Sequence, residues 1–323
     1  MTDAIRLGTR RSALAVAQSS LVAHAIEEAS GWQVQLVEIV SEGDTSRASL
    51  VSMGGTGVFA TRLREALLAD ECDLLVHSLK DLPVAIPHGL VIAAVPQRAD
   101  ARDVVITRDG TPLAELPAGS TVGTGSPRRV AQVLRANPAL DVRDLRGNVD
   151  SRLARVRGGE LDAVVLAAAG LERLGAELDL HVEPRALDAW PTAAGQGALA
   201  VETREGGDLV DVLAQLDHPA TRAAVTAERE VLGRIGAGCH APVGVHATFD
   251  GDQLQVAAVV YGADAANDVR ASAFSAPAQE YIRAKESGAD AARREALPEA
   301  RRIGAEAADL LLARGAAGLM QIT

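Results

Sequence analysis

The chain has 323 residues, a hydrophobic content of 48% and a formal net charge of −11. This length suits two or three domains with packed cores, and the acidic balance disfavours binding to nucleic acid, which requires a basic face. No apolar run approaches the roughly 20 residues needed to span a membrane, and the N-terminus lacks the features of a signal peptide. Cys72 and Cys239 are too few for a disulfide framework, so we expect a cytoplasmic protein with reduced thiols.

The first hundred residues predict alternating strands and helices. Strands are expected at 5–9, 33–40, 73–76 and 90–95, with helices at 12–29 and 59–68. Residues 41–57 are polar and rich in glycine, which predicts a long loop of a kind that is usually functional. The alternation is typical of an α/β fold with a mainly parallel sheet and helices on both faces.

The same rhythm restarts near Asp103. Strands are expected at 104–107, 121–123, 142–145 and 162–166, with helices at 127–135, 149–156 and around Leu171. The break at 96–103 predicts two lobes with a cleft between them. Residues 197–202 read as one more strand, which we expect to return to the first lobe.

From Pro219 onward the pattern changes to that of a small α+β domain. It predicts a helix at 220–232, a Gly/Pro loop at 236–244, three antiparallel strands at 245–249, 254–261 and 269–274, and a mostly helical stretch at 278–313. We therefore expect a first α/β lobe made of 1–98 and 197–217, a second α/β lobe made of 99–196, and a C-terminal α+β domain made of 218–323.

Basic residues recur at the points where strands are expected to give way to helices. In α/β sheets ligands bind at the carboxyl ends of strands, and the free N–H groups of a helix start favour an anion. The candidates are Arg10 and Arg11 beside Ser12, Lys80 beside Asp81, Ser126 with Arg128 and Arg129, and Arg146 with Arg152. One arginine alone is more often a solvated surface ion pair, but four such junctions predict a cleft for a ligand with several carboxylates.

The local chemistry at these junctions leaves alternatives open. Ser126 can cap the helix that Pro127 begins, and Asn148 can cap the next helix. Asp81 is suited to proton transfer or to stabilising a developing cation, but an Asp that caps the turn before Pro83 is the more common case for such a residue alone.

The two cysteines differ in their surroundings. Cys239 lies in RIGAGCHAP, where the flanking glycines indicate an accessible loop thiol that can act as a nucleophile or an attachment point. A small packing residue is the alternative, and it is the more common case for a lone cysteine. Cys72 is expected to be structural. Neither cysteine has the spacing of a metal site, and the chain lacks a phosphate-binding loop motif.

Taken together, the motifs resemble the hydroxymethylbilane synthase family, also called porphobilinogen deaminases. The segments that carry the resemblance span nearly the whole chain: LGTRRSALA, GGTGVFATRLREALL, CDLLVHSLKDLP, VGTGSPRR, LRGNVDSRL, DAVVLAAAGLERLG, AAGQGALAVE, and TAERE followed by GAGCHAP. The resemblance implies stepwise condensation of four porphobilinogen molecules with loss of ammonia, followed by hydrolysis to the linear tetrapyrrole hydroxymethylbilane. It also implies a monomer with three domains, the first two like type II periplasmic binding proteins.

The resemblance further implies a role for individual residues. Cys239 matches the cysteine that holds a dipyrromethane cofactor by a thioether, and Asp81 matches the catalytic aspartate. The positions that match cofactor-binding residues are Lys80, Ser126, Arg128 and Arg129. The positions that match residues holding porphobilinogen or the growing oligopyrrole are Arg10, Ser12, Arg146, Arg152 and Arg173. No metal is implied.

Some positions depart from the family pattern. Thr56 stands where many members have lysine, Pro127 replaces a common apolar residue, and His240 stands where Gln is common. Residues 278–298 add length to the third domain. Two rival classes fit parts of the sequence: a non-enzymatic anion-binding protein of the periplasmic type, and a cysteine-nucleophile transferase without a pyrrole cofactor. The intact mass separates them, because only a covalent dipyrromethane adds mass at Cys239.

Overall fold

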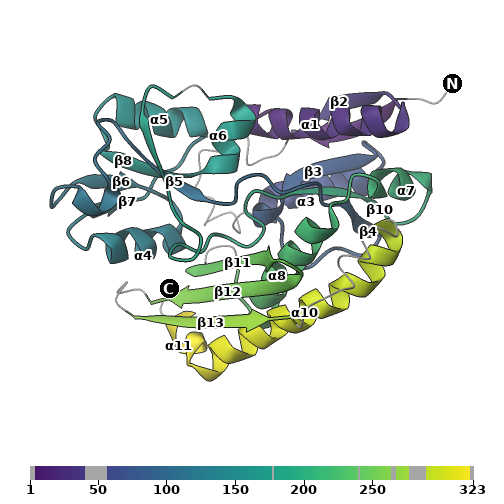
Figure 1. Ribbon diagram of the computed structural model, residues 1–323. Helices are drawn as coiled ribbons and strands as arrows, with labels where there is room; N and C mark the ends of the chain where they lie inside the picture. Colours follow the sequence, from purple (N-terminus) through teal and green to yellow (C-terminus); the bar gives the residue numbers. More distant parts are fainter. Residues whose placement is uncertain are drawn as a thin grey trace.

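A computed structural model describes residues 4–40, 57–176, 178–238, 241–262, 267–275 and 289–320. Three sheets organise these residues into an α/β fold with two similar parallel-rich sheets and a smaller C-terminal α+β unit (Figure 1). Residues 41–56 of the expected loop at 41–57 lie outside the described residues, as do residues 278–288 of the expected helical stretch at 278–313. Within the described ranges, no helix is long and apolar enough to cross a membrane.

The first sheet has the strand order β2-β1-β3-β10-β4. Its strands are β1 (Ile5–Thr9), β2 (Val34–Glu38), β3 (Leu74–Ser78), β4 (Leu90–Ala94) and β10 (Leu199–Arg204). The helices of this part of the chain are α1 (Ala13–Ser30), α3 (Gly57–Leu68) and α7 (Asp208–Ala214). Ser12 starts α1 by accepting a hydrogen bond from the Ala15 N–H, and Gly31 ends it at φ 72, a conformation that favours glycine.

The second sheet repeats this layout with the order β7-β6-β8-β5-β9. Its strands are β5 (Asp103–Thr107), β6 (Thr121–Gly123), β7 (Asp141–Arg143), β8 (Ala163–Ala167) and β9 (His181–Pro184). The helices are the 3₁₀ turn η2 (Leu113–Glu115), α4 (Pro127–Ala136), α5 (Val149–Arg157) and α6 (Ala168–Leu174). Strand β9 was not expected, because it lies at the edge of the sheet and its side chains are mostly exposed, which removes the apolar pattern of a buried strand.

Both sheets are mainly parallel, as expected for the first lobe, and each contains one antiparallel strand. Strand β10 is antiparallel to both of its neighbours, and β5 is antiparallel to both of its own. The chain crosses from the first sheet to the second between β4 and β5, and it returns between β9 and β10. The antiparallel strand of each sheet is therefore the one that follows a crossing. The expectation that the strand near 197–202 returns to the first lobe is confirmed, since β10 lies between β3 and β4.

The C-terminal unit contains the three antiparallel strands that the sequence predicts. They are β11 (Val243–Asp250), β12 (Gln253–Tyr261) and β13 (Asp268–Phe274), and they pack with α8 (Pro219–Arg234), α10 (Ala289–Ala313) and α11 (Ala316–Met320) around one apolar core. The β11–β12 turn carries Gly251 at φ 61, a value that favours glycine in a tight hairpin. The long helix α10 runs diagonally below α8 in Figure 1.

The two crossings between the sheets are bonded to each other and to the C-terminal unit. Arg98 Nε donates to the Gln196 carbonyl at 2.7 Å, and a Cβ on Gly197, whose φ is +85, would lie 2.6 Å from the Ala99 carbonyl oxygen. Glu228 of α8 is fully buried and binds Arg98 Nη1 at 2.7 Å and the Gly195 N–H at 2.6 Å. The two sheets and the C-terminal unit are therefore in contact at these crossing segments. Their hydrogen bonds hold the two sheets in place on either side of the cavity.

Candidate active site

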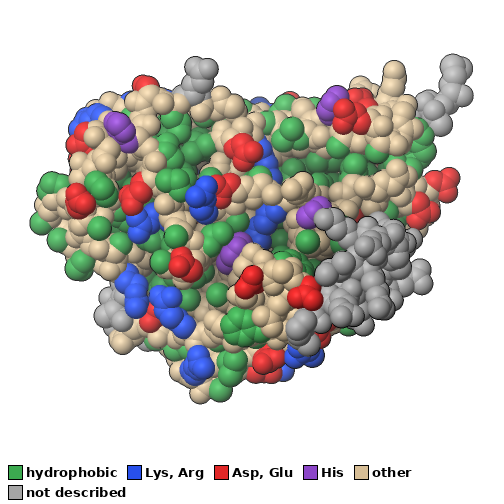
Figure 2. Space-filling view, viewed as in Figure 1, with side chains coloured by type: hydrophobic (Ala, Val, Ile, Leu, Met, Phe, Trp, Pro, Cys, Tyr) green, Lys and Arg blue, Asp and Glu red, His purple; other side chains and the backbone are tan. Residues whose placement is uncertain are grey.

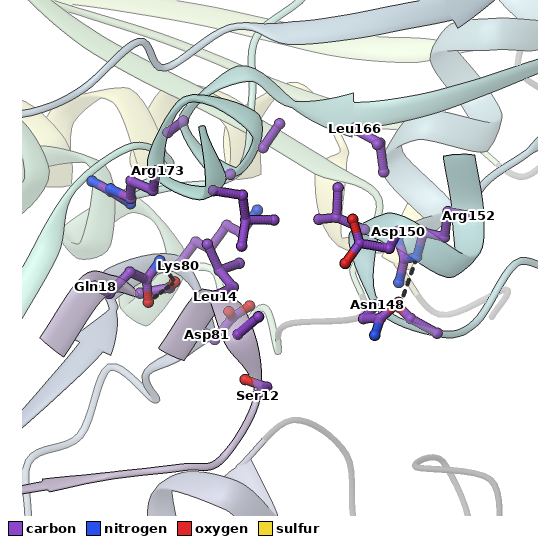
Figure 3. Close-up of a pocket in the computed structure, with 18 of the residues that line it drawn as sticks. Ser12, Leu14, Gln18, Lys80, Asp81, Asn148, Asp150, Arg152, Leu166 and Arg173 are labelled. Atoms are coloured by element: carbon purple, nitrogen blue, oxygen red, sulfur yellow. Dashed lines mark hydrogen bonds between the residues drawn. The ribbon is translucent and has the colours of Figure 1, made fainter. Parts of the chain in front are cut away.

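A cavity of about 570 Å³ lies between the carboxyl ends of strands from the two parallel-rich sheets. In Figure 3, Ser12, Lys80 and Asp81 lie on one side of it, and Asn148, Asp150 and Arg152 lie on the other. Six lining side chains are basic and two are acidic: Arg10, Lys80, Arg129, Arg146, Arg152 and Arg173 against Asp81 and Asp150. On the face drawn in Figure 2, by contrast, basic and acidic side chains are interspersed. The cavity is thus a local anion site in an acidic chain.

The turn that presents Asp81 follows directly from the buried strand β3. Leu79 and Leu82 are 1% and 3% exposed, so the apolar residues on either side of Lys80 and Asp81 are anchored in the core. The 3₁₀ turn η1 (Leu79–Asp81) is closed by the backbone, because the Leu82 N–H donates to the Leu79 carbonyl. The Asp81 side chain is exposed and lines the cavity. Its carboxylate is therefore placed for chemistry in the cavity, and the turn before Pro83 is closed without it.

Lys80 is held in an environment that disfavours its charge. Burial lowers the pKa of its ammonium to about 8, and the nearby Arg129 acts in the same direction, while Asp81 and Asp103 oppose the shift. Its Nζ lies 3.5 Å from Gln196 Oε1. A carboxylate bound beside Lys80 would raise this pKa again by stabilising the ammonium, so Lys80 favours an anionic ligand.

Arg128 and Arg129 begin α4 and share one buried carboxylate, that of Asp103. Arg128 Nη1 lies 2.8 Å from Asp103 Oδ2, and Arg129 Nη2 lies 2.6 Å from Asp103 Oδ1. Arg128 also donates to Gln132 Oε1 at 2.7 Å and is not among the residues that line the cavity. Arg129 does line it, and its Nε is buried without a hydrogen-bond partner. Of the two arginines, only Arg129 lines the cavity.

Asp103 was not recognised as a site residue in the sequence. Burial alone would raise its pKa, but Arg128 and Arg129 hold the pKa of this carboxyl well below its usual range. It also accepts hydrogen bonds from Trp190 Nε1 at 3.0 Å and Gln196 Nε2 at 2.9 Å. The available signal was an acid at the start of the apolar run DVVIT, since a carboxylate buried in a strand requires charged partners.

The caps of the two second-lobe helices behave differently from each other. Asn148 caps α5 as expected, with its Oδ1 accepting from the Ser151 N–H at 2.8 Å. Ser126 precedes α4, but its side chain makes no capping hydrogen bond, which corrects the expectation that it does. Its backbone N–H instead lies 3.3 Å from Thr124 Oγ1. The Ser126 hydroxyl lines the cavity, where it can serve a ligand.

The remaining arginines are fixed by backbone groups or by a nearby acid. Arg152 Nε donates to the Gly147 carbonyl at 2.9 Å, and Arg173 Nη2 donates to the Gly197 carbonyl at 2.6 Å. Arg146 Nε lies 3.2 Å from Asp144 Oδ2. Burial lowers the pKa of both Arg152 and Arg173. A guanidinium is not deprotonated in proteins, so both side chains keep their charge. These three side chains are part of the second-lobe wall of the cavity.

The structure therefore brings together most of the residues singled out in the sequence. Those that line the cavity are Arg10, Ser12, Lys80, Asp81, Ser126, Arg129, Arg146, Arg152 and Arg173. Arg11 and Arg128 do not line it, and Cys239 lies outside the described residues. Sequence reasoning missed Gln18, Ser78 and Asp150. Gln18 Nε2 donates to Ser78 Oγ at 2.8 Å, and this polar pair carries no signal in the sequence because its members are 60 residues apart.

A second cavity of about 230 Å³ is lined by many of the same residues. Arg10, Ser12, Gln18, Ser78 and Asp81 line both cavities, and the smaller one is completed by apolar groups from α3 and β3. Asp81 is thus accessible from two adjoining spaces. Among the described residues, no group of three or more His, Cys, Asp or Glu side chains is arranged to hold a metal ion.

Two family models match this chain. The model described as porphobilinogen deaminase, dipyromethane cofactor binding domain, matches residues 5–211, and that described as porphobilinogen deaminase, C-terminal domain, matches residues 222–313. The porphobilinogen deaminase of Leifsonia xyli subsp. xyli is 55% identical over 85% of this chain and 84% of its own. Porphobilinogen deaminase 1 of Streptomyces coelicolor is 48% identical over 99% of this chain and 98% of its own. Among solved structures, the periplasmic aliphatic sulphonate binding protein SsuA from Escherichia coli is 14% identical and has a TM-score of 0.38, over 74% of this chain and 76% of its own.

Proposed function

The chain belongs to the porphobilinogen deaminase family, and from this premise we propose how its cavity performs the family's reaction. It is a transferase of tetrapyrrole biosynthesis, a hydroxymethylbilane synthase that condenses four porphobilinogen molecules with loss of ammonia. The two rival classes, a periplasmic-type binding protein and a cofactor-free cysteine transferase, are set aside by this membership. The observation that carries the proposal is the basic cavity with Asp81 in its wall.

The residues of the cavity fit a dipyrromethane, the cofactor of the matched domain. A dipyrromethane carries two acetate and two propionate groups, and the cavity lining carries a formal surplus of four positive charges. The Arg129 Nε is a buried donor without a partner, and the Ser126 hydroxyl is not used as a cap. Lys80, Ser126 and Arg129 therefore bind the cofactor carboxylates. Arg128 contributes by holding Asp103, which in turn fixes Arg129.

Cys239 is the attachment point of the cofactor in this proposal. The described chain runs from the end of α8 at Arg234 to Gly238, the residue directly before Cys239. When bound, the group supplies an anchored, electron-rich pyrrole carbon as the first nucleophile. Attachment through a thioether requires a free thiol, which is the state that the cytoplasm maintains.

The arginines of the opposite wall hold the substrate and the growing chain. Each porphobilinogen brings two carboxylates, and a guanidinium can bind a carboxylate with two parallel hydrogen bonds. Arg10 and Ser12 provide such donors on the first lobe, and Arg146, Arg152 and Arg173 provide them on the second. Because both lobes contribute, a bound polyanion bridges them and is oriented relative to Asp81.

Asp81 carries the chemical step. Loss of ammonia from porphobilinogen leaves an electron-poor azafulvene, whose developing positive charge a neighbouring carboxylate stabilises. Asp81 also accepts the pyrrole N–H hydrogen bond and can take the proton that the attacking ring loses from its α-carbon when that ring becomes aromatic again. Since Asp81 lines both adjoining cavities, the incoming ring and the ring that attacks it can lie on either side of one carboxylate.

The organisation of the whole protein completes the proposal. Residues 1–98 with 197–217 form the first lobe, 99–196 form the second, and 218–323 form the C-terminal domain that carries Cys239. The chain acts as a monomer in the cytoplasm and binds porphobilinogen and the growing oligopyrrole. Size-exclusion chromatography with light scattering tests the monomer, and a dimer mass at micromolar concentration would contradict it.

The decisive test is Asp81→Asn in protein of known cofactor content. The substitution keeps the size of the side chain and removes its charge, so carboxylate binding stays intact while the chemical step slows by at least about a hundredfold. Single-turnover release of ammonia measures that step. A rate within about threefold of the wild type would remove Asp81 from the mechanism.

A further inference from the structure

Helix α8 supports the turn that presents Asp81 from the interior of the protein. Val225 of this helix is 2% exposed and belongs to the same apolar cluster as Leu79 and Leu82, the two residues that flank Lys80 and Asp81. The turn that carries Asp81 therefore packs against the C-terminal domain as well as against its own sheet. Figure 1 shows α8 lying between the first sheet and α10.

Arg229 lies one helical turn after Val225, on the same face of α8, and binds the backbone that follows Asp81. Its Nη1 donates to the Leu82 carbonyl at 2.9 Å, and its Nη2 donates to the Pro83 and Val84 carbonyls at 2.7 and 3.2 Å. One guanidinium thus holds three successive carbonyl groups. These carbonyls belong to an irregular segment between η1 and β4, where no sheet ladder is present to fix them.

We infer that Arg229 is a positioning residue for Asp81, an inference that rests on the proposed catalytic role of Asp81. Arg229 does not line either of the two cavities that Asp81 lines. It acts through the backbone that begins one residue after Asp81. Without these three hydrogen bonds, the segment after Asp81 loses the anchor that Arg229 provides to α8, and the Asp81 carboxylate shifts relative to the bound pyrroles.

The same helix leads to the proposed cofactor cysteine. Helix α8 ends at Arg234, and Cys239 follows five residues later. Arg229 therefore ties the catalytic turn to the helix from which the cofactor loop departs. This connection gives the C-terminal domain a part in aligning Asp81 with the growing chain, in addition to carrying the cofactor.

The expected effect is on the rate of the chemical step. A displacement of about 1 Å at a catalytic group can reduce the rate by about a hundredfold, whereas the carboxylate-binding arginines remain in place. Arg229→Met keeps the length of the aliphatic part and removes the guanidinium. We expect kcat to fall by at least about tenfold, with KM for porphobilinogen and the cofactor content within about twofold of the wild type.

Arg222 provides a matched control on the same helix. It lies about two turns before Arg229 and also donates to backbone carbonyls of the first lobe, those of Ile92 and Ala93, each at 3.1 Å. These carbonyls belong to β4, whereas those bound by Arg229 follow Asp81 directly. Arg222→Met therefore removes hydrogen bonds from α8 to the first lobe, together with the ion pair between Arg222 and the buried Asp217. We expect it to lower the melting temperature while kcat stays within about twofold of the wild type.

A double-mutant cycle with Asp81→Asn separates positioning from general damage. If Arg229 acts through the Asp81 carboxylate, Arg229→Met lowers the residual rate of Asp81→Asn by less than about twofold. Multiplicative losses in the double variant, or equal losses of kcat in the Arg222 and Arg229 variants, would overturn the inference. A wild-type rate in Asp81→Asn alone contradicts the proposed mechanism instead, so the two failures are distinct.

A second variant covers the case in which Arg229→Met does not fold. Arg229→Lys keeps the charge but replaces the planar fork with a single ammonium group. We expect its kcat to be at least about threefold below that of the wild type, again without a further loss in the Asp81→Asn background. A wild-type kcat in Arg229→Lys would count against a positioning role for the planar guanidinium of Arg229.

Discussion

The pair Arg128 and Arg129 allows one prediction to be developed in detail, because adjacent residues with the same chemistry have different surroundings. Both bind Asp103, but only Arg129 lines the cavity. We therefore expect Arg128→Leu to act mainly on the stability of the fold. Arg129→Leu should act on stability and also on uptake of the cofactor.

The magnitude for Arg128→Leu follows from the contacts of Asp103. The side chains of Arg128 and Asp103 are 3% and 0% exposed, and their ion pair measures 2.8 Å. Removing one partner of a buried ion pair costs about 3–5 kcal/mol. Because Asp103 keeps Arg129, Trp190 and Gln196, we expect the lower end of this range, about 3 kcal/mol.

Urea unfolding measures this loss of stability, provided that the proteins compared carry no cofactor. A bound cofactor stabilises the folded state by an amount that depends on how much protein carries it, so both variants are made in a Cys239→Ser background. In that background, Arg128→Leu and Arg129→Leu should each lower the free energy of unfolding by a similar amount. With Cys239 restored, the intact mass should show less cofactor in Arg129→Leu than in Arg128→Leu.

The opposite pattern would refute this reasoning. If Arg128→Leu unfolds within about 1 kcal/mol of its parent but purifies without cofactor, then Arg128 binds the cofactor directly. The Asp103 network would then be dispensable for the fold. An equal loss of cofactor in both variants, at equal stability, would likewise show that the cavity wall includes both arginines.

Three further predictions concern Lys80, Arg152 and Cys239. The pKa of Lys80 is about 8 in the folded state, compared with 10.5 for the free side chain. Between pH 8 and pH 10.5 the unfolded chain therefore binds more protons than the folded chain does. The resulting cost of about 3 kcal/mol is fully present below pH 8 and is relieved as the pH rises toward 10.5. In the Cys239→Ser background, urea unfolding should therefore show stability rising over this interval more than in Lys80→Met, and parallel curves would contradict the shift. Arg152→Leu should carry the cofactor but stall with partial chains; mass spectrometry after brief exposure to porphobilinogen resolves them, and wild-type elongation would refute the role. Cys239→Ser should fold, lack cofactor and lose nearly all activity; an unmodified mass in fully active wild-type protein would exclude the attachment site.

The sequence determined which segments form strands and helices wherever an apolar pattern was strong. The strand at residues 5–9 and the three strands of the C-terminal domain are found where they were predicted. It also determined most of the cavity, because the carboxyl ends of parallel strands meet at one edge of a sheet. Lys80 and Asp81 follow β3, Ser126 follows β6 and Arg146 follows β7, and all four residues line one cavity at these strand ends.

Only the tertiary structure decided where individual side chains are directed. Arg128 and Arg129 are equivalent in the sequence, yet Arg128 is bound to Asp103 and Gln132 away from the cavity, while Arg129 reaches the wall. Likewise, no local pattern indicates that Arg229 binds carbonyls about 145 residues earlier in the chain. A strand-to-helix junction fixes the position of a backbone. The direction of a charged side chain depends on which buried carboxylate or unpaired carbonyl the fold brings within reach, because such groups must be satisfied inside the protein.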